Sequence, residues 1–110
     1  RVPKKWAGAK QYFEKVADRQ TWDFALVNIA MVAKVSGGKV TDVRMACGGV
    51  QCTPRRLTNV ESLMKGEKIG TEMETLAKRV AARGAKALNY NHFKIPLMGS
   101  LAARAVRSLA

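Results

Sequence analysis

The sequence predicts an α+β domain in which an antiparallel sheet of three to four strands is followed by three helices packed on one face. Two observations lead to this prediction. Apolar residues alternate with a period of two in the first half of the chain and recur at helical spacing in the second half. A glycine pair, Gly37-Gly38, separates two alternating segments and is typical of a tight hairpin turn. Strands followed by helices are the α+β pattern.

The size of the chain fits one folded domain, which we assign to residues 1–110. The chain has 110 residues and 47% of them are hydrophobic, which suits one core but not two. No apolar run approaches the roughly 20 residues of a membrane-spanning helix, and no signal-peptide pattern opens the chain. The chain starts at Arg1 without Met. We therefore expect a piece of a longer polypeptide.

Three segments show the periodicity of strands. Residues 9–19 alternate and keep one face polar, whereas residues 23–36 have one uninterrupted apolar face, as expected of a central strand. Residues 40–50 alternate again after the Gly37-Gly38 turn. Helix propensity alone also permits a helix over residues 24–33. The glycine turn and the strand that follows it favour a strand.

A glycine pair, Gly48-Gly49, ends the third strand. Such a pair permits either the close approach of a ligand or a sharp bend, and the local chemistry favours the bend. Thr53-Pro54 then fixes the chain, and we expect Arg55 and Arg56 to form a basic cap on the next helix.

The second half of the sequence predicts three helices, over residues 58–66, 71–84 and 93–109. The first two begin with capping-box spacing, Thr58-x-x-Glu61 and Thr71-x-x-Glu74. We therefore expect each threonine to cap its helix, with the glutamate three residues later completing the box.

The chain is strongly basic, with 20 Lys and Arg against 8 Asp and Glu, for a net charge of +12. Such a charge suggests nucleic acid or an anionic surface as a partner. However, the basic residues are scattered, and aromatic residues make up only 6% of the chain and do not interleave with them. Docking on acidic partner subunits explains the charge at least as well, so nucleic-acid binding is the weaker hypothesis.

No catalytic or metal-binding constellation is present. Cys47, Cys52 and His92 are too few for the four ligands of a structural zinc site, and we expect both cysteines to be reduced, with Cys47 in or near the core. The chain has no nucleophile elbow, GxGxxG loop or Walker loop. The sequence therefore predicts no catalytic residue, no metal ligand and no self-contained nucleotide site.

One basic and aromatic cluster could meet a planar anionic ligand. Lys15 and Arg19 are flanked by Tyr12, Phe13 and Trp22. A lysine can donate to a ring nitrogen or carbonyl while an aromatic neighbour packs on the ring. The local chemistry alone favours the other interpretation, a solvated strand face with an aromatic edge.

Several ordered motifs resemble one protein family. They are Tyr12-x-x-Lys15-x-x-x-Arg19, Trp22-Asp23-Phe24-Ala25, Gly38-Lys39-Val40-x-Asp42-Val43-Arg44, Gly48-Gly49-Val50-x-x-Thr53-Pro54-x-Arg56 and the tail Phe93-Lys94 with Leu97, Leu101 and Arg104-Ala105. Together they resemble the C-terminal domain of the flavoprotein subunit of molybdenum hydroxylases, the relatives of xanthine dehydrogenase, aldehyde oxidoreductase and carbon monoxide dehydrogenase. Cys52 and His92-Phe93 depart from the family pattern.

The resemblance implies a C-terminal domain of a larger FAD-binding subunit whose upstream FAD-binding module is absent from this chain. In the family, electrons pass from a molybdopterin centre through iron-sulfur clusters to FAD and then to NAD, oxygen or another acceptor. We expect the domain to complete the flavin environment within such a cytoplasmic oxidoreductase and to be catalytically incomplete alone. Its partners would be the FAD-binding module, the iron-sulfur subunit and the molybdopterin subunit.

The resemblance also implies a cofactor-binding role for Lys15, which corresponds to a lysine near the flavin in relatives. Trp22 and Asp23 follow on the same approach and are weaker candidates. A nucleic-acid-binding module and a docking or dimerisation domain remain as alternative hypotheses. The substrate, the electron acceptor and the oligomeric state are not specified by these residues.

Overall fold

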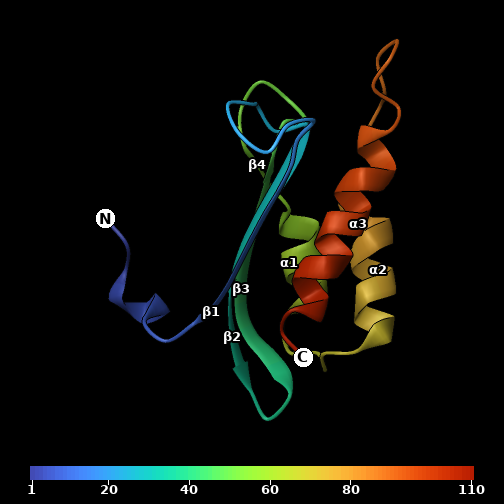
Figure 1. Cartoon of the computed structure of the whole chain (residues 1–110). Coiled ribbons are helices and arrows are strands. Elements are labelled where there is room, and N and C mark those ends of the chain that lie inside the picture. The colour runs from blue at the N-terminus through green and yellow to red at the C-terminus, as the bar shows by residue number, and fades with distance from the viewer.

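The domain consists of two layers, a four-stranded sheet and a layer of helices on one of its faces (Figure 1). The computed structural model describes all residues from 1 to 110. The strands are antiparallel neighbours in chain order: β1 Lys10–Val16, β2 Val27–Ser36, β3 Lys39–Gly48 and β4 Arg55–Arg56. The helices are α1 Thr58–Met64, α2 Thr71–Ala81 and α3 Lys94–Arg107. This architecture confirms the predicted α+β fold.

The core lies between the two layers because alternate residues of the central strands point toward the helices. The buried residues of β2 and β3 are Val27, Ile29, Met31, Ala33, Val40, Val43, Met45 and Cys47. Side chains from all three helices close the other side, among them Val60, Met73 and Leu101. The remaining alternate residues of the strands therefore point away from the helices.

The hairpin between β2 and β3 confirms the strand interpretation of the central segment and rules out the helix over residues 24–33. Gly37 and Gly38 have φ values of 56° and 73°, in the left-handed region that a tight hairpin turn requires. β2 begins at Val27 rather than at residue 23. The four preceding residues instead belong to the loop that returns from β1.

The predicted helix caps are wrong. Leu57 occupies the N-cap position of α1 and Gly70 that of α2, and neither end has a side-chain cap. The carboxylate of Glu61 accepts hydrogen bonds from the Met45 amide, at 3.0 Å, and from the Arg56 guanidinium. Tertiary partners thus replaced the local ones that the capping box requires.

Arg55 and Arg56 were expected to cap a helix, and they form the short strand β4 instead. They pair with residues near the end of β3, with Arg55 opposite Cys47 and Arg56 opposite Ala46. The Leu57 amide then donates to the Met45 carbonyl at 2.9 Å. β4 thus extends the sheet and places the Arg56 side chain where it reaches Glu61.

The N-terminal segment leaves the sheet on the side opposite the helices (Figure 1). It contains one short 3-10 turn, η1 Lys4–Trp6, which has no buried residues. None of the helices has both the length and the apolar character of a membrane-spanning segment.

Candidate functional site

The face of the sheet opposite the helices is not covered by any element of the chain except the N-terminal segment (Figure 1). A cross-strand row runs over its centre, from Phe13 in β1 through Ala30 in β2 and Ala46 in β3 to Arg56 in β4. The side chain of Phe13 is 66% exposed. The small alanines between the larger ends of the row leave a shallow trough along the middle strands.

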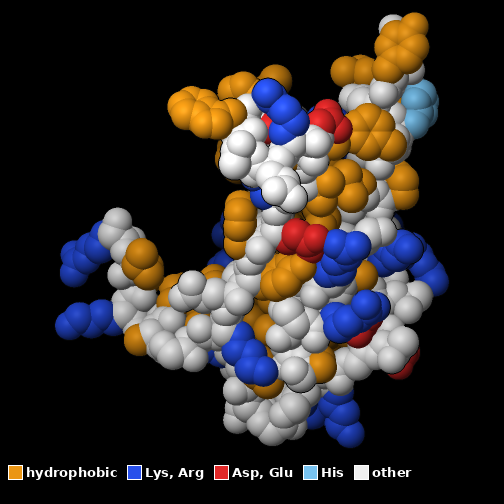
Figure 2. All heavy atoms as spheres, viewed as in Figure 1, with side chains coloured by type: hydrophobic (Ala, Val, Ile, Leu, Met, Phe, Trp, Pro, Cys, Tyr) orange, Lys and Arg blue, Asp and Glu red, His pale blue; other side chains and the backbone are white.

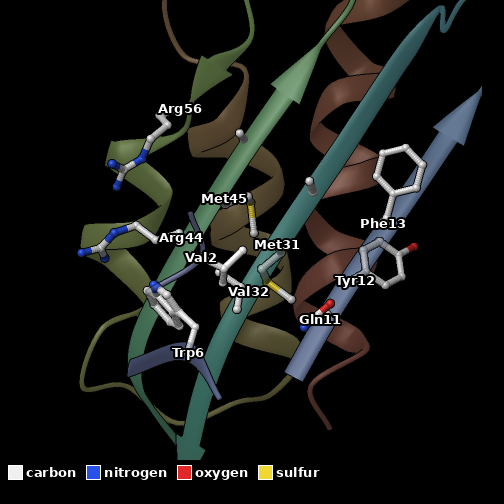
Figure 3. A pocket seen from close by; sticks show the side chains of 12 residues that line it. Val2, Trp6, Gln11, Tyr12, Phe13, Met31, Val32, Arg44, Met45 and Arg56 are labelled. Atoms are coloured by element: carbon white, nitrogen blue, oxygen red, sulfur yellow. The ribbon is translucent and has the colours of Figure 1, made fainter. Parts of the chain in front are cut away.

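This trough is part of a hollow of about 560 Å³, which we call the open-face hollow. Nine of its 12 lining residues are hydrophobic. Figure 3 shows Val2 and Trp6 of the N-terminal segment over the central strands and Phe13 on β1. The guanidinium carbon of Arg44 lies 5.6 Å from the centre of the Trp6 ring, a cation–π distance.

The sequence-predicted site residues come together in the loop between β1 and β2. Lys15, near the end of β1, donates through its Nζ to the backbone carbonyl of Asp23. The Arg19 amide donates to the Asp23 carboxylate at 3.0 Å, and the Arg19 guanidinium donates to the Trp22 carbonyl at 2.8 Å. These four residues, which we call the Lys15 clasp, hold the Lys15 ammonium against the backbone of the loop between β1 and β2, the loop that also carries the exposed Trp22.

Trp22 has the least usual backbone in the chain. Its φ is 53°, and no other non-glycine residue has a positive φ. Its side chain is 95% exposed, so no packing within this chain explains a conformation that costs a bulky residue about 1–2 kcal/mol. Strained backbone of this kind clusters at active sites and ligand-binding sites.

The predicted aromatic cluster around Lys15 is divided between the two faces of the sheet. Tyr12 packs against the core and donates to Glu14. Burial, together with that hydrogen bond to a carboxylate, raises the pKa of Tyr12 to about 12. Phe13 lies on the open face, as Lys15 does two residues later. Phe13, on the same face as Lys15, and the exposed Trp22 therefore remain as the aromatic candidates of the site, whereas Tyr12 does not belong to it.

Gly48 and Gly49 serve the packing of the chain itself. A Cβ on Gly49 would lie 2.7 Å from the Leu26 carbonyl oxygen, and one on Gly48 would lie 2.8 Å from the Asn28 side chain. Lys94 donates to the Gly49 carbonyl at 2.8 Å. The glycine pair therefore lets the end of β3 approach the loop that carries the clasp.

The sequence interpretation missed the open-face hollow. A signal for it was present, because small residues stand at outward positions of the two central strands, Ala30 in β2 and Ala46 in β3. No group of three or more His, Cys, Asp or Glu residues could hold a metal ion. Cys47 is buried and Cys52 exposed, and both are free thiols.

Comparison with known protein families gives one extensive match. The model of the CO dehydrogenase flavoprotein C-terminal domain matches residues 11–109. The match begins within β1 and includes all three helices, the Lys15 clasp and both glycine pairs.

Two curated relatives are medium chains of larger enzymes. The chain is 32% identical over 82 residues to the glyceraldehyde dehydrogenase medium chain of Sulfolobus acidocaldarius, and the aligned region covers 74% of this chain and 28% of the relative. It is 31% identical over 72 residues to the nicotine 6-hydroxylase medium subunit of Paenarthrobacter nicotinovorans, and here the aligned region covers 66% of this chain and 24% of the relative. The chain thus matches about a quarter of the length of each relative.

Solved structures show the same fold. Quinoline 2-oxidoreductase from Pseudomonas putida 86 superimposes with a TM-score of 0.82 at 20% identity, over 92% of this chain and 36% of that one. A chain of carbon monoxide dehydrogenase from Hydrogenophaga pseudoflava superimposes with a TM-score of 0.81 at 28% identity, over 92% of this chain and 36% of that one.

Proposed function

Because the chain belongs to the CO dehydrogenase flavoprotein C-terminal domain family, we propose that it is the C-terminal part of the FAD-binding medium subunit of a molybdenum-containing hydroxylase. In this role it completes the surroundings of FAD, through which electrons pass from iron-sulfur clusters to an acceptor. The match over residues 11–109 supports the family assignment, and the Lys15 clasp is the structural observation that most supports the role.

The residues of the clasp fit one edge of a flavin. An ammonium has three donors, and Lys15 uses one of them on the Asp23 carbonyl, which leaves two for a ligand. The exposed indole of Trp22 offers an apolar face for a planar ring. Asp23 acts through its backbone carbonyl, which fixes the position of the ammonium.

FAD, when bound, supplies the capacity to accept and pass on electrons. The contribution of this chain is electrostatic, because the Lys15 ammonium is held in place by the clasp rather than free to turn away. A fixed positive charge favours the more negative redox state of a neighbouring group, and Lys15 would therefore raise the reduction potential at the site.

The same residues do not fit a whole dinucleotide. The chain has no glycine-rich loop at a helix N-terminus to hold the phosphates. The FAD-binding module of the same subunit would hold the dinucleotide, and the iron-sulfur and molybdopterin subunits would be the further partners.

The names of the two curated relatives specify different substrates, glyceraldehyde and nicotine, so we place substrate choice outside this domain. We also propose a cytoplasmic location, because the two free thiols agree with a reducing compartment.

The proposed function is tested by removing the Lys15 ammonium from the intact medium subunit. We expect Lys15→Ala to lower the midpoint potential of the bound flavin, and a tenfold change in the redox equilibrium corresponds to about 30 mV for a two-electron couple. Potentiometric titration followed by visible absorbance measures this shift.

Two variants complete the test. Lys65→Ala removes an exposed ammonium that follows α1, on the helical side of the sheet, and should leave the potential unchanged. Lys15→Arg retains the charge and should retain most of the potential. If Lys15→Ala and Lys65→Ala give the wild-type potential alike, Lys15 does not belong to the flavin site.

A further inference from the structure

We propose that the uncovered face of the sheet is the surface on which the FAD-binding module of the same subunit docks, with an acidic apolar segment of that module in the open-face hollow. This docking rests on the proposed function, since it is the proposed medium subunit that supplies the module. It adds to that function a defined interface, built from residues outside the Lys15 clasp.

The first support is the apolar character of the face. Val2 and Phe13 are 83% and 66% exposed, and both line the hollow. Between them lie Ala30 and Ala46, whose small side chains leave room for the side chains of a partner. A hollow of about 560 Å³ with an apolar floor and polar edges resembles the core and rim of a protein interface.

The second support is the charge around the hollow. Arg44 and Arg56 line it, and Lys15 stands on the same face beyond Phe13. Asp42 and Glu61 pair with the two arginines, while the Lys15 ammonium has no carboxylate partner within 4.0 Å. The chain as a whole carries +12. A second copy would bring equal positive charge to the same face, so charge complementarity favours an acidic partner over self-association.

The third support is the path of the N-terminal segment. The family match begins at residue 11, so the segment before it lies outside the matched domain. Val2 and Trp6 of this segment line the hollow (Figure 3). Any polypeptide that precedes Arg1 in a longer subunit would therefore leave from the rim of the hollow and keep a preceding module close to it.

The fourth support is the position of the hollow beside the clasp. Phe13 lines the hollow, and Lys15 follows it two residues later on the same face of β1, about 7 Å further along the strand. A module that presents a flavin to Lys15 would also lie next to Phe13. One docking event would thus complete the cofactor site and cover the apolar face.

Hydroxyl-radical footprinting tests the docking directly. The intact medium subunit and the 110-residue chain are oxidised in parallel, and modification of Phe13 is compared with that of Tyr90. Tyr90 is 93% exposed and lies in the loop between α2 and α3. Because the core of an interface excludes water, we expect Phe13 oxidation to fall about fivefold or more in the subunit while Tyr90 oxidation stays the same. Equal Phe13 oxidation in both proteins would overturn the docking.

A pair of variants separates docking from a general effect on the fold. Ala30→Glu places a carboxylate on the exposed centre of the open face, and Ser62→Glu places one on the exposed side of α1. We expect Ala30→Glu to restore Phe13 oxidation in the subunit toward the level of the isolated chain, and Ser62→Glu to leave the protection intact. Protection that survives Ala30→Glu would contradict the assigned surface.

Flavin content distinguishes the two proposals. A subunit that retains FAD but leaves Phe13 unprotected would overturn the docking and leave the proposed function standing. A purified subunit without flavin would overturn the proposed function and, with it, the occupant named here. If sedimentation shows that the 110-residue chain dimerises and that Phe13 is protected in the dimer, a second copy is the occupant and the docking is wrong.

Discussion

At the scale of single residues, backbone strain and the candidate site coincide at Trp22. The left-handed φ of 53° occurs where Arg19 donates to the Trp22 carbonyl and to the Asp23 carboxylate. The resemblance to the flavoprotein family indicated Lys15, Trp22 and Asp23. It could not indicate the strain, because a bulky residue gives no local signal for a positive φ.

Replacing Trp22 with glycine should therefore stabilise the domain. Glycine adopts a positive φ without steric cost, which outweighs its larger entropy in the unfolded chain, and we expect a net gain of roughly 0.5 kcal/mol. Phe24→Gly is the matched control, because the Phe24 side chain is exposed like that of Trp22, at 93%, but its residue has no positive φ. It should lose about 0.5–1 kcal/mol. Urea unfolding measures both, and equal losses in the two variants would exclude strain at Trp22.

A second residue-scale feature is the buried carboxylate of Glu61, which is 8% exposed. Burial alone would raise the pKa of Glu61, but hydrogen bonds from Arg56 and from the Met45 amide, with the positive charge of Arg56, outweigh it and lower the pKa. A carboxyl group with a lowered folded-state pKa stabilises the fold above its unfolded value, about 4.3, and loses this contribution as the pH falls through the folded-state pKa.

The pH dependence of unfolding tests this linkage. Glu61→Gln should lower the free energy of unfolding at pH 7 by about 2 kcal/mol, because a buried charge-assisted hydrogen bond is lost. It should also flatten the decline in stability below about pH 4. Glu74→Gln removes the partner of the exposed Arg107 and should cost about 0.5 kcal/mol or less. If the free energy of unfolding of Glu61→Gln declines below pH 4 as steeply as that of the wild type, Glu61 does not contribute to the acid sensitivity.

At the scale of elements, the close approach of α2 and α3 depends on Gly99. A Cβ at this position would lie 2.6 Å from the Lys78 carbonyl oxygen, a backbone atom that cannot move aside without a shift of α2. An alanine in a helix interior gains about 1 kcal/mol over glycine, while overpacking costs typically about 1–3 kcal/mol.

We therefore expect Gly99→Ala to destabilise the domain by about 1 kcal/mol, whereas Ser100→Ala, at the next position of α3, should be neutral or slightly stabilising. Thermal unfolding of the two variants measures the difference. A higher melting temperature for Gly99→Ala than for the wild type would show that the helices have room to move apart.

The three long strands and the three helices were predictable from the sequence, whereas β4 and the exact ends of the elements were not. Periodicity of two and the Gly37-Gly38 turn are local signals, and they identified β2 and β3 correctly. The capping boxes failed because Glu61 and Glu74 bind partners outside their own helices: Glu61 accepts from the Met45 amide, 16 residues earlier, and Glu74 from Arg107, 33 residues later. Local spacing could not reveal those partners, since they meet only after the helices pack on the sheet.

At the scale of the whole molecule, positive charge is spread rather than gathered. On the side seen in Figure 2, Lys and Arg side chains lie over the N-terminal segment, the sheet and the helices, with acidic side chains among them. Five ion pairs neutralise some of this charge. This distribution suits contacts with several neighbouring polypeptides better than a groove for nucleic acid. The prediction of helices on one face left the other face without helices, but it did not include the hollow there, because Val2 and Trp6, which help to line it, lie far along the chain from Ala30 and Ala46.

If this domain completes a flavin site that it cannot hold alone, flavin binding should depend on both parts of the subunit. FAD content and the visible spectrum are measured for the isolated domain, for the intact medium subunit and for that subunit lacking this domain. We predict that the isolated domain is colourless after incubation with FAD and dialysis, and that the intact subunit retains one FAD. The truncated subunit should show an altered flavin spectrum or faster loss of FAD. Stoichiometric flavin on the isolated domain, or an unchanged flavin in the truncated subunit, would show that the domain does not complete the flavin site.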